Sequence, residues 1–175
     1  LNGIKDAVIT SFEGPHPVGN VGVQIHEVAP MNKGEVVWTM GIQDVANLGE
    51  GLSTGQFVGR RRVALTGSRS QPALLDTSIG TPMAHLTKDR VMMEDTRVIS
   101  GHVLTGTARG GEEALGFFDQ QVSCIPEGRE PLFFLTKGWL GPGFDKFSAS
   151  RAFPTWLMPK GKEYDLSTNS NGEER

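Results

Sequence analysis

The chain has 175 residues, of which 37% are hydrophobic and 21% are charged, and its formal net charge is −3. This balance is typical of a globular protein with one large or two small domains. The basic run Arg60–Arg62 is too short for a nucleic-acid-binding surface and is expected to be a solvated strand entrance or a partner-facing edge. The single cysteine, Cys124, excludes an internal disulfide and any iron–sulfur cluster or zinc site built on cysteines of this chain alone.

The chain opens with a predicted strand at Ala7–Phe12, a glycine-rich turn over residues 14–22 and a predicted helix over 23–28. Strand, turn and helix in this order can hold a phosphate against helix N–H groups. The glycine spacing fits neither the dinucleotide fingerprint nor the phosphate loop, which ends in Gly-Lys-Ser/Thr. We therefore interpret Pro15 and Pro17 as stiffening the turn, and Gly19 and Gly22 as permitting close packing.

A second strand is predicted at Glu35–Met40 and a second helix at Gly41–Leu52, with Gly55 at its carboxyl end. The inward positions of that helix are expected to be Ile42, Val45, Ala46 and Leu52. Alternating strands and helices indicate an α/β unit with a parallel sheet. Two strands are too few for a domain, so we expect residues 1–58 to be the end of a Rossmann-like domain, in an internal fragment of a longer protein.

The central part of the chain predicts a different architecture. Two β-branched runs flank the turn Gly67–Pro72, which indicates a hairpin. Thr81 is expected at the N-cap and Pro82 at the first position of a short helix. The residues expected to line one face of this helix are Met83, Leu86 and Val91.

Further strands are predicted over residues 98–104 and over 117–125. Residues 121–125 show an alternating strand pattern, in which Cys124 is expected to be a small buried hydrophobic residue. Hairpin, helix and strand in this order open a β-grasp, a small ubiquitin-like sheet around one helix. We predict a β-grasp domain at residues 59–128, followed by an irregular β-rich connecting region at 129–175. The fold class is therefore α+β.

The connecting region carries seven aromatic residues between positions 133 and 156 with no regular period. They are expected either to pack on the β-grasp core or to form an exposed docking surface for a partner or an apolar ligand. Trp139 and Lys146 are the candidate docking residues.

Functional side chains are sparse in this sequence. No paired carboxylates and no Ser/His/Asp or Cys/His arrangement indicate a catalytic site, and no ligand spacing around His26 indicates a metal site. The candidate ligand or partner loop is instead the turn near the amino end, because loops on rigid scaffolds often carry function. Its candidate residues are His16, Pro17, Gly19 and Gly22.

Several segments, taken together and in order, resemble the A subunit of the Na⁺-translocating NADH:quinone oxidoreductases (Na⁺-NQR). They are Phe12–Gly19, Val37–Trp38, Ile42–Val45, Thr54–Gly55, Arg62–Gly67, Arg97–Gly106 and Lys146–Ser148. The resemblance implies the end of a Rossmann-like domain, then a soluble-ligand-binding β-grasp (SLBB) domain. It also implies that amino-terminal and helical carboxy-terminal regions of such a protein lie outside this fragment.

The resemblance further implies a peripheral subunit on the cytoplasmic side of the bacterial inner membrane, docked on an integral membrane subunit. Such a complex is an oxidoreductase and translocase of the respiratory chain, which couples NADH oxidation and ubiquinone reduction to sodium transport. The A subunit would contribute quinone binding and assembly and bind no cofactor itself. Flavins, iron–sulfur centres and NADH would belong to partner subunits, and the isolated fragment would be inactive.

Two alternatives remain open from the residues themselves. Residues 63–107 alone would fit a free-standing β-grasp module that binds a small molecule. The glycine-rich turn alone would fit an independent NADH-binding enzyme, which a titration with NADH would test.

Overall fold

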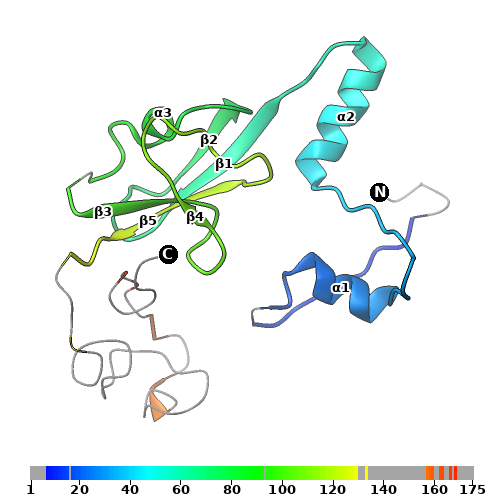
Figure 1. Cartoon of the computed structure of the whole chain (residues 1–175), viewed down its shortest axis with the longest axis horizontal. Coiled ribbons are helices and arrows are strands. Elements are labelled where there is room, and N and C mark those ends of the chain that lie inside the picture. The colour runs from blue at the N-terminus through cyan, green and yellow to red at the C-terminus, as the bar shows by residue number, and fades with distance from the viewer. Residues whose placement is uncertain are drawn as a thin grey trace. The chain divides into compact units, whose positions relative to one another are not determined.

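The computed structural model describes residues 7–15, 17–92, 94–129, 133, 157–159, 162–163, 166 and 168. The chain divides into two compact units, Leu1–Ala46 and Asn47–Arg175. The described residues form three helices and one five-stranded sheet (Figure 1). The fold therefore contains both helices and strands, as the sequence predicts.

The described residues of the first unit contain helix α1 (Val21–Val28) and the start of helix α2 (Ile42–Thr54). Asn20 is the N-cap of α1, and its carbonyl accepts hydrogen bonds from Val23 and Gln24. Gly55, at φ +69°, follows α2, and its N–H donates to the Gly51 carbonyl at 2.8 Å. Glycine tolerates this left-handed conformation at a helix end, so the predicted carboxyl end of α2 is confirmed.

The two strands predicted at Ala7–Phe12 and Glu35–Met40 are wrong, because neither segment forms a strand in the structure. A strand needs a neighbour to receive its N–H and C=O groups, and neither segment pairs with a strand among the described residues. The inward face predicted for α2 is also wrong: Ile42 is 79% exposed and Leu52 78% exposed. Hydrophobic spacing sets one face of a helix but supplies no surface to bury it.

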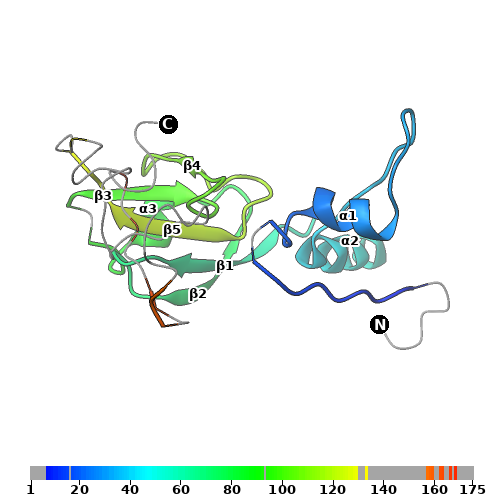
Figure 2. The same cartoon turned by 90° about the horizontal axis from the view of Figure 1, so that it is seen from below.

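The second unit contains the sheet, whose strand order is β2-β1-β5-β3-β4. Figure 2 shows β3, β5, β1 and β2 lying side by side. The strands are β1 (Arg60–Thr66), β2 (Ala73–Ser78), β3 (Thr96–Ser100), β4 (Thr107–Ala108) and β5 (Gln121–Pro126). β1 pairs antiparallel with β2 and parallel with β5, and β3 pairs antiparallel with both β5 and β4. The predicted hairpin, third strand and last strand are confirmed.

Strand boundaries differ from the prediction at two places. β3 ends at Ser100 rather than at residue 104, because Gly101 turns the chain at φ +93°. Phe117 and Phe118 precede β5 rather than belonging to it, and their rings meet edge to face with centroids 5.0 Å apart. Both phenylalanines are exposed. The period of a sequence identifies strands more securely than it identifies their ends.

Helix α3 (Met83–Thr87) packs on one face of the sheet, where the core lies. Its N-cap is Pro82, one position later than predicted, while the Thr81 hydroxyl donates to the Ser78 carbonyl. The buried core cluster consists of Val63, Leu65, Met83, Leu86, Val98, Val122 and Cys124. The inward positions predicted for Met83 and Leu86 are confirmed, and Val91 packs against the same cluster from beyond the helix end. Cys124 is 0% exposed, as predicted.

Gly67 begins the turn between β1 and β2 and lies against β5. Its φ is +106°, and a Cβ there would lie 2.1 Å from the Cys124 carbonyl oxygen. That carbonyl accepts a hydrogen bond from Arg69 N–H at 3.2 Å, so the turn is held against the strand. Only glycine combines this backbone conformation with so close an approach.

Arg61 departs from the prediction of a solvated basic run, because its side chain lies on the core face of β1. It is 3% exposed, and its guanidinium donates to the Phe117 carbonyl at 2.7 Å. The guanidinium also lies 5.8 Å from the centroid of the Phe117 ring. The alternation of β1 places Arg61 on the same face as Val63 and Leu65, so the strand period decides its burial.

Candidate functional site: a cavity on the second face of the sheet

The sheet face opposite α3 carries a cavity of about 410 Å³. Successive side chains of a strand point to opposite faces, so Val122 and Cys124 fill the core while Gln121, Ser123 and Ile125 face the other way. The lining residues are Thr66, Gly67, Ser68, His102, Val103, Gln121, Ser123, Ile125, Glu163 and Leu166. The strands β1 and β5, the turn after β1, the loop after β3 and a segment near the carboxyl end thus surround a space large enough for a small molecule.

A chain of hydrogen bonds orders the polar floor of the cavity. The Gln121 side-chain amide donates to Thr66 Oγ1 at 3.1 Å and to Ser123 Oγ at 2.9 Å. Ser123 Oγ donates in turn to the Gly101 carbonyl at 2.8 Å, and Thr66 Oγ1 to the Val122 carbonyl at 3.3 Å. These contacts join β1, β5 and the loop after β3, so the floor is set by the sheet register.

The wall formed by His102 is also fixed by hydrogen bonds. His102 Nδ1 accepts from the Leu104 N–H at 3.2 Å, and Nε2 lies 2.8 Å from Thr105 Oγ1. Because Nδ1 accepts, the neutral ring carries its proton on Nε2 and donates to Thr105. The imidazole is therefore oriented by its own loop before any ligand enters.

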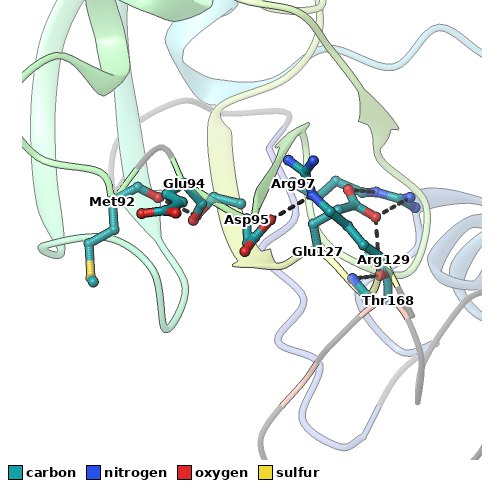
Figure 3. Close-up of polar contacts among 9 residues, drawn as sticks. Met92, Glu94, Asp95, Arg97, Glu127, Arg129 and Thr168 are labelled. Atoms are coloured by element: carbon teal, nitrogen blue, oxygen red, sulfur yellow. Dashed lines mark hydrogen bonds and ion pairs between the residues drawn. The ribbon is translucent and has the colours of Figure 1, made fainter. Parts of the chain in front are cut away.

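The segment near the carboxyl end is fastened beside the cavity by a polar cluster that we call the Thr168 clasp: Arg97, Glu127, Gly128 and Thr168 (Figure 3). Arg97 donates to both carboxylate oxygens of Glu127 at 2.7 Å. Thr168 Oγ1 accepts from the Gly128 N–H at 2.6 Å and donates to Glu127 at 3.2 Å. Thr168 is 5% exposed, so the clasp is largely shielded from water.

A second ion pair lies next to the clasp. Asp95 Oδ1 lies 2.6 Å from Arg129 Nε, and the Asp95 carbonyl accepts from the Glu127 N–H at 2.8 Å (Figure 3). Asp95 has φ +47°, a conformation that costs free energy in a non-glycine residue and that these contacts hold in place. The start of β3 and the end of β5 are therefore tied together beside the clasp.

None of the predicted site residues that the structure describes lines the cavity. Pro17, Gly19 and Gly22 are not part of the cavity, and a Cβ at Gly19 or Gly22 would meet no atom within 4 Å, so the close packing predicted there is wrong. His16, Trp139 and Lys146 lie outside the described residues, as do all the tail aromatics except Phe133, which is 61% exposed. A ligand or docking role for these residues stays a prediction.

The cavity residues were not predicted from the sequence, although one signal was present. The alternation that identified β5 also placed Gln121 and Ser123 on the face opposite Cys124. No local pattern indicates that Thr66 and Glu163 lie beside them, since the contacts are long-range.

The described part of the chain has neither a cluster of metal-binding side chains nor a membrane-spanning helix. No group of three or more His, Cys, Asp or Glu side chains there is placed to hold a metal ion. Likewise, none of its helices has the length and apolar character needed to cross a bilayer. Burial raises the pKa of the Cys124 thiol to about 11, so this residue is a protonated core side chain at neutral pH.

Two family models match the chain. The model described as the NqrA second alpha/beta domain matches residues 1–57. The SLBB model described as the NQRA C-terminal domain matches residues 62–109. Both models describe the same protein family, and they match in the order of the chain.

Curated relatives that are named as the A subunit of Na(+)-translocating NADH-quinone reductase match nearly the whole chain. The relative from Hahella chejuensis is 41% identical over 173 residues, which is 98% of this chain and 38% of the relative. Those from Vibrio atlanticus and Yersinia pestis are 41% and 42% identical over 94% of this chain and 36% of their own length. The chain thus spans less than two fifths of these relatives, and it belongs to the NqrA family, the A subunits of the Na⁺-translocating NADH-quinone reductases.

Proposed function

We propose that this chain works as part of the NqrA subunit of a Na⁺-translocating NADH-quinone reductase. The observation that carries the proposal is the match to relatives of that name over 94–98% of the chain. The complex, rather than this chain, would be the oxidoreductase and sodium translocase. The chain would be a peripheral part of it, on the cytoplasmic side of the inner membrane and in contact with an integral membrane subunit.

Co-purification tests this assignment. The tagged chain, joined to the remainder of a homologous NqrA, would be expressed in a bacterium lacking its own NqrA. Recovery of the other subunits with the tag, and of sodium-dependent NADH oxidation in membranes, is the expected result. A tagged protein that is folded but never retains a partner would contradict the proposal.

We further propose that the sheet unit is a β-grasp domain. Its strand order, with β1 and β5 parallel at the centre and α3 on one face, supports this assignment. For residues 1–58 a Rossmann-like arrangement is supported only by the match to an alpha/beta family model, since neither predicted strand is formed. The division at residues 58 and 128 stays a proposal.

The cavity on the second face is our proposed contact for quinone. The floor of the cavity is polar, while Val103, Ile125 and Leu166 supply apolar walls. A ligand with an apolar ring and oxygen substituents would be complementary to both. Flavins, iron–sulfur centres and NADH would reside on partner subunits, because a lone buried cysteine cannot hold a cluster. Saturable binding of ubiquinone-1 or its reduced form to the chain tests this contact.

The same cavity also supports a second candidate, a free-standing module that binds another small molecule. The two candidates differ in their partners and in their ligands. A thermal shift with cobalamin or a glycan but not with quinones, together with the absence of co-purifying subunits, would favour the free-standing module.

A further inference from the structure

The orientation of the Gln121 side-chain amide follows from the groups around it. Ser123 and Thr66 each have one hydroxyl proton, and each donates it to a backbone carbonyl, Gly101 or Val122. A carbonyl oxygen can only accept, so both hydroxyl protons are committed. Both hydroxyl oxygens must then act as acceptors toward Gln121.

Only the NH₂ end of the Gln121 amide can satisfy two acceptors. Nε2 accordingly lies 3.1 Å from Thr66 Oγ1 and 2.9 Å from Ser123 Oγ, which uses both of its protons. The amide oxygen, Oε1, makes no hydrogen bond to any described residue. Gln121 is half-buried and lines the cavity, so what it can offer a ligand is an acceptor.

The other polar walls strengthen this bias toward acceptors. The Glu163 carboxylate is exposed at the cavity and makes no ion pair or hydrogen bond within the described part of the chain. His102 already uses Nδ1 and Nε2 within its own loop, and the Ser68 hydroxyl can donate or accept. A complementary ligand therefore carries a hydrogen-bond donor on a small apolar body.

We propose that the cavity binds the reduced quinol in preference to the oxidised quinone. This inference rests on the proposed quinone contact and specifies its redox form. A quinone presents only carbonyl acceptors, which would face the acceptors Gln121 Oε1 and Glu163, whereas the two hydroxyl groups of a quinol donate to them. A site whose polar groups are left unpaired rejects the ligand that lacks the matching group.

The experiment compares anaerobic binding of ubiquinol-1 and ubiquinone-1 to the 175-residue chain by saturation-transfer NMR and calorimetry. Hydroquinone and 1,4-dimethoxybenzene form a second pair that differs in donors but cannot interconvert by oxidation. One hydrogen bond to a partly exposed acceptor predicts about a ten-fold tighter Kd for the donor-bearing member of each pair.

Three variants locate the effect. Gln121→Met removes the acceptor at similar length and should abolish most of the preference. Glu163→Gln adds N–H donors at an exposed position, where the substitution should not affect folding. It should raise the affinity for ubiquinone-1. Gln71→Met makes the same chemical change at an exposed position that does not line the cavity, and should leave both affinities unchanged.

The possible results distinguish the quinol preference from the quinone contact on which it rests. Equal or tighter binding of ubiquinone-1 overturns the quinol preference and leaves the quinone contact standing. A preference that survives in both Gln121→Met and Glu163→Gln overturns its assignment to these two acceptors. Absence of binding by every probe overturns the quinone contact and the preference together.

Discussion

Replacing Gly67 by alanine should destabilise the sheet unit through two separate effects. The φ of +106° costs an L-residue about 1 to 2 kcal/mol. The added Cβ would lie 2.1 Å from the Cys124 carbonyl oxygen and 2.7 Å from its nitrogen, both backbone atoms that cannot turn aside. Overpacking of this kind costs a further ~1 to 3 kcal/mol, so we expect the free energy of unfolding to fall by about 4 kcal/mol.

Gly80→Ala is the matched control. Gly80 has a similar φ of +86°, but a Cβ there would meet no atom within 4 Å. This variant should lose only the conformational part, about 1 to 2 kcal/mol. The difference between the two variants therefore isolates the collision with β5.

Cys124 provides the assay, since it is the only cysteine of the chain and lies buried beside Gly67. Its labelling by a thiol reagent at low concentration reports the population of the open form when opening and closing outpace labelling. Because about 1.4 kcal/mol is a factor of ten, Gly67→Ala should label roughly several hundred-fold faster than the unmodified chain and Gly80→Ala about ten-fold faster. Equal rates for the two variants would refute the reasoning.

The remaining predictions concern the buried thiol and the clasp. Because the folded pKa of Cys124 is about 11, the folded chain keeps a proton that the unfolded chain releases near its ordinary value of 9.0, so the free energy of unfolding should fall as pH rises from 9.0 to about 11. The slope should be about 1.4 kcal/mol per pH unit and should disappear in Cys124→Ala, as measured by urea unfolding at each pH. Thr168→Val leaves the Gly128 N–H without its partner and should cost about 1 to 3 kcal/mol; an unchanged urea midpoint would argue against the clasp. A double-mutant cycle on Arg97→Met and Glu127→Gln should give a coupling of about 1.5 to 3 kcal/mol, since the pair is bidentate and mostly shielded, and additive effects would contradict it.

Local signals in the sequence predicted the structure best. The β-branched runs identified β1 and β2, period-2 alternation identified β5, and the turn residues between β1 and β2 identified the hairpin. Gly55 marked the end of α2, because the left-handed backbone conformation at a helix end depends on that residue and not on a distant partner. In contrast, Ala7–Phe12 and Glu35–Met40 have strand-like composition but no partner strand among the described residues, and composition cannot provide one.

The candidate site could not be predicted from local sequence patterns either, because it depends on contacts between distant segments. The turn with the most distinctive sequence, around Gly19 and Gly22, has open space around it, whereas the cavity gathers Thr66, Gln121 and Glu163 from distant parts of the chain. The alternation of β5 determined which residues share a face. It did not determine which loop would cover that face.

The amino-acid sequence by itself determined the family, the sheet strands of the second unit and the burial of Cys124, because these depend on residue type and on short-range period. Only the tertiary structure decided that β5 lies parallel to β1, that Arg61 turns inward to Phe117, and that the Gln121 amide presents its oxygen to a cavity. Those features arise from pairing between segments far apart in the chain, where the partner rather than the residue sets the outcome.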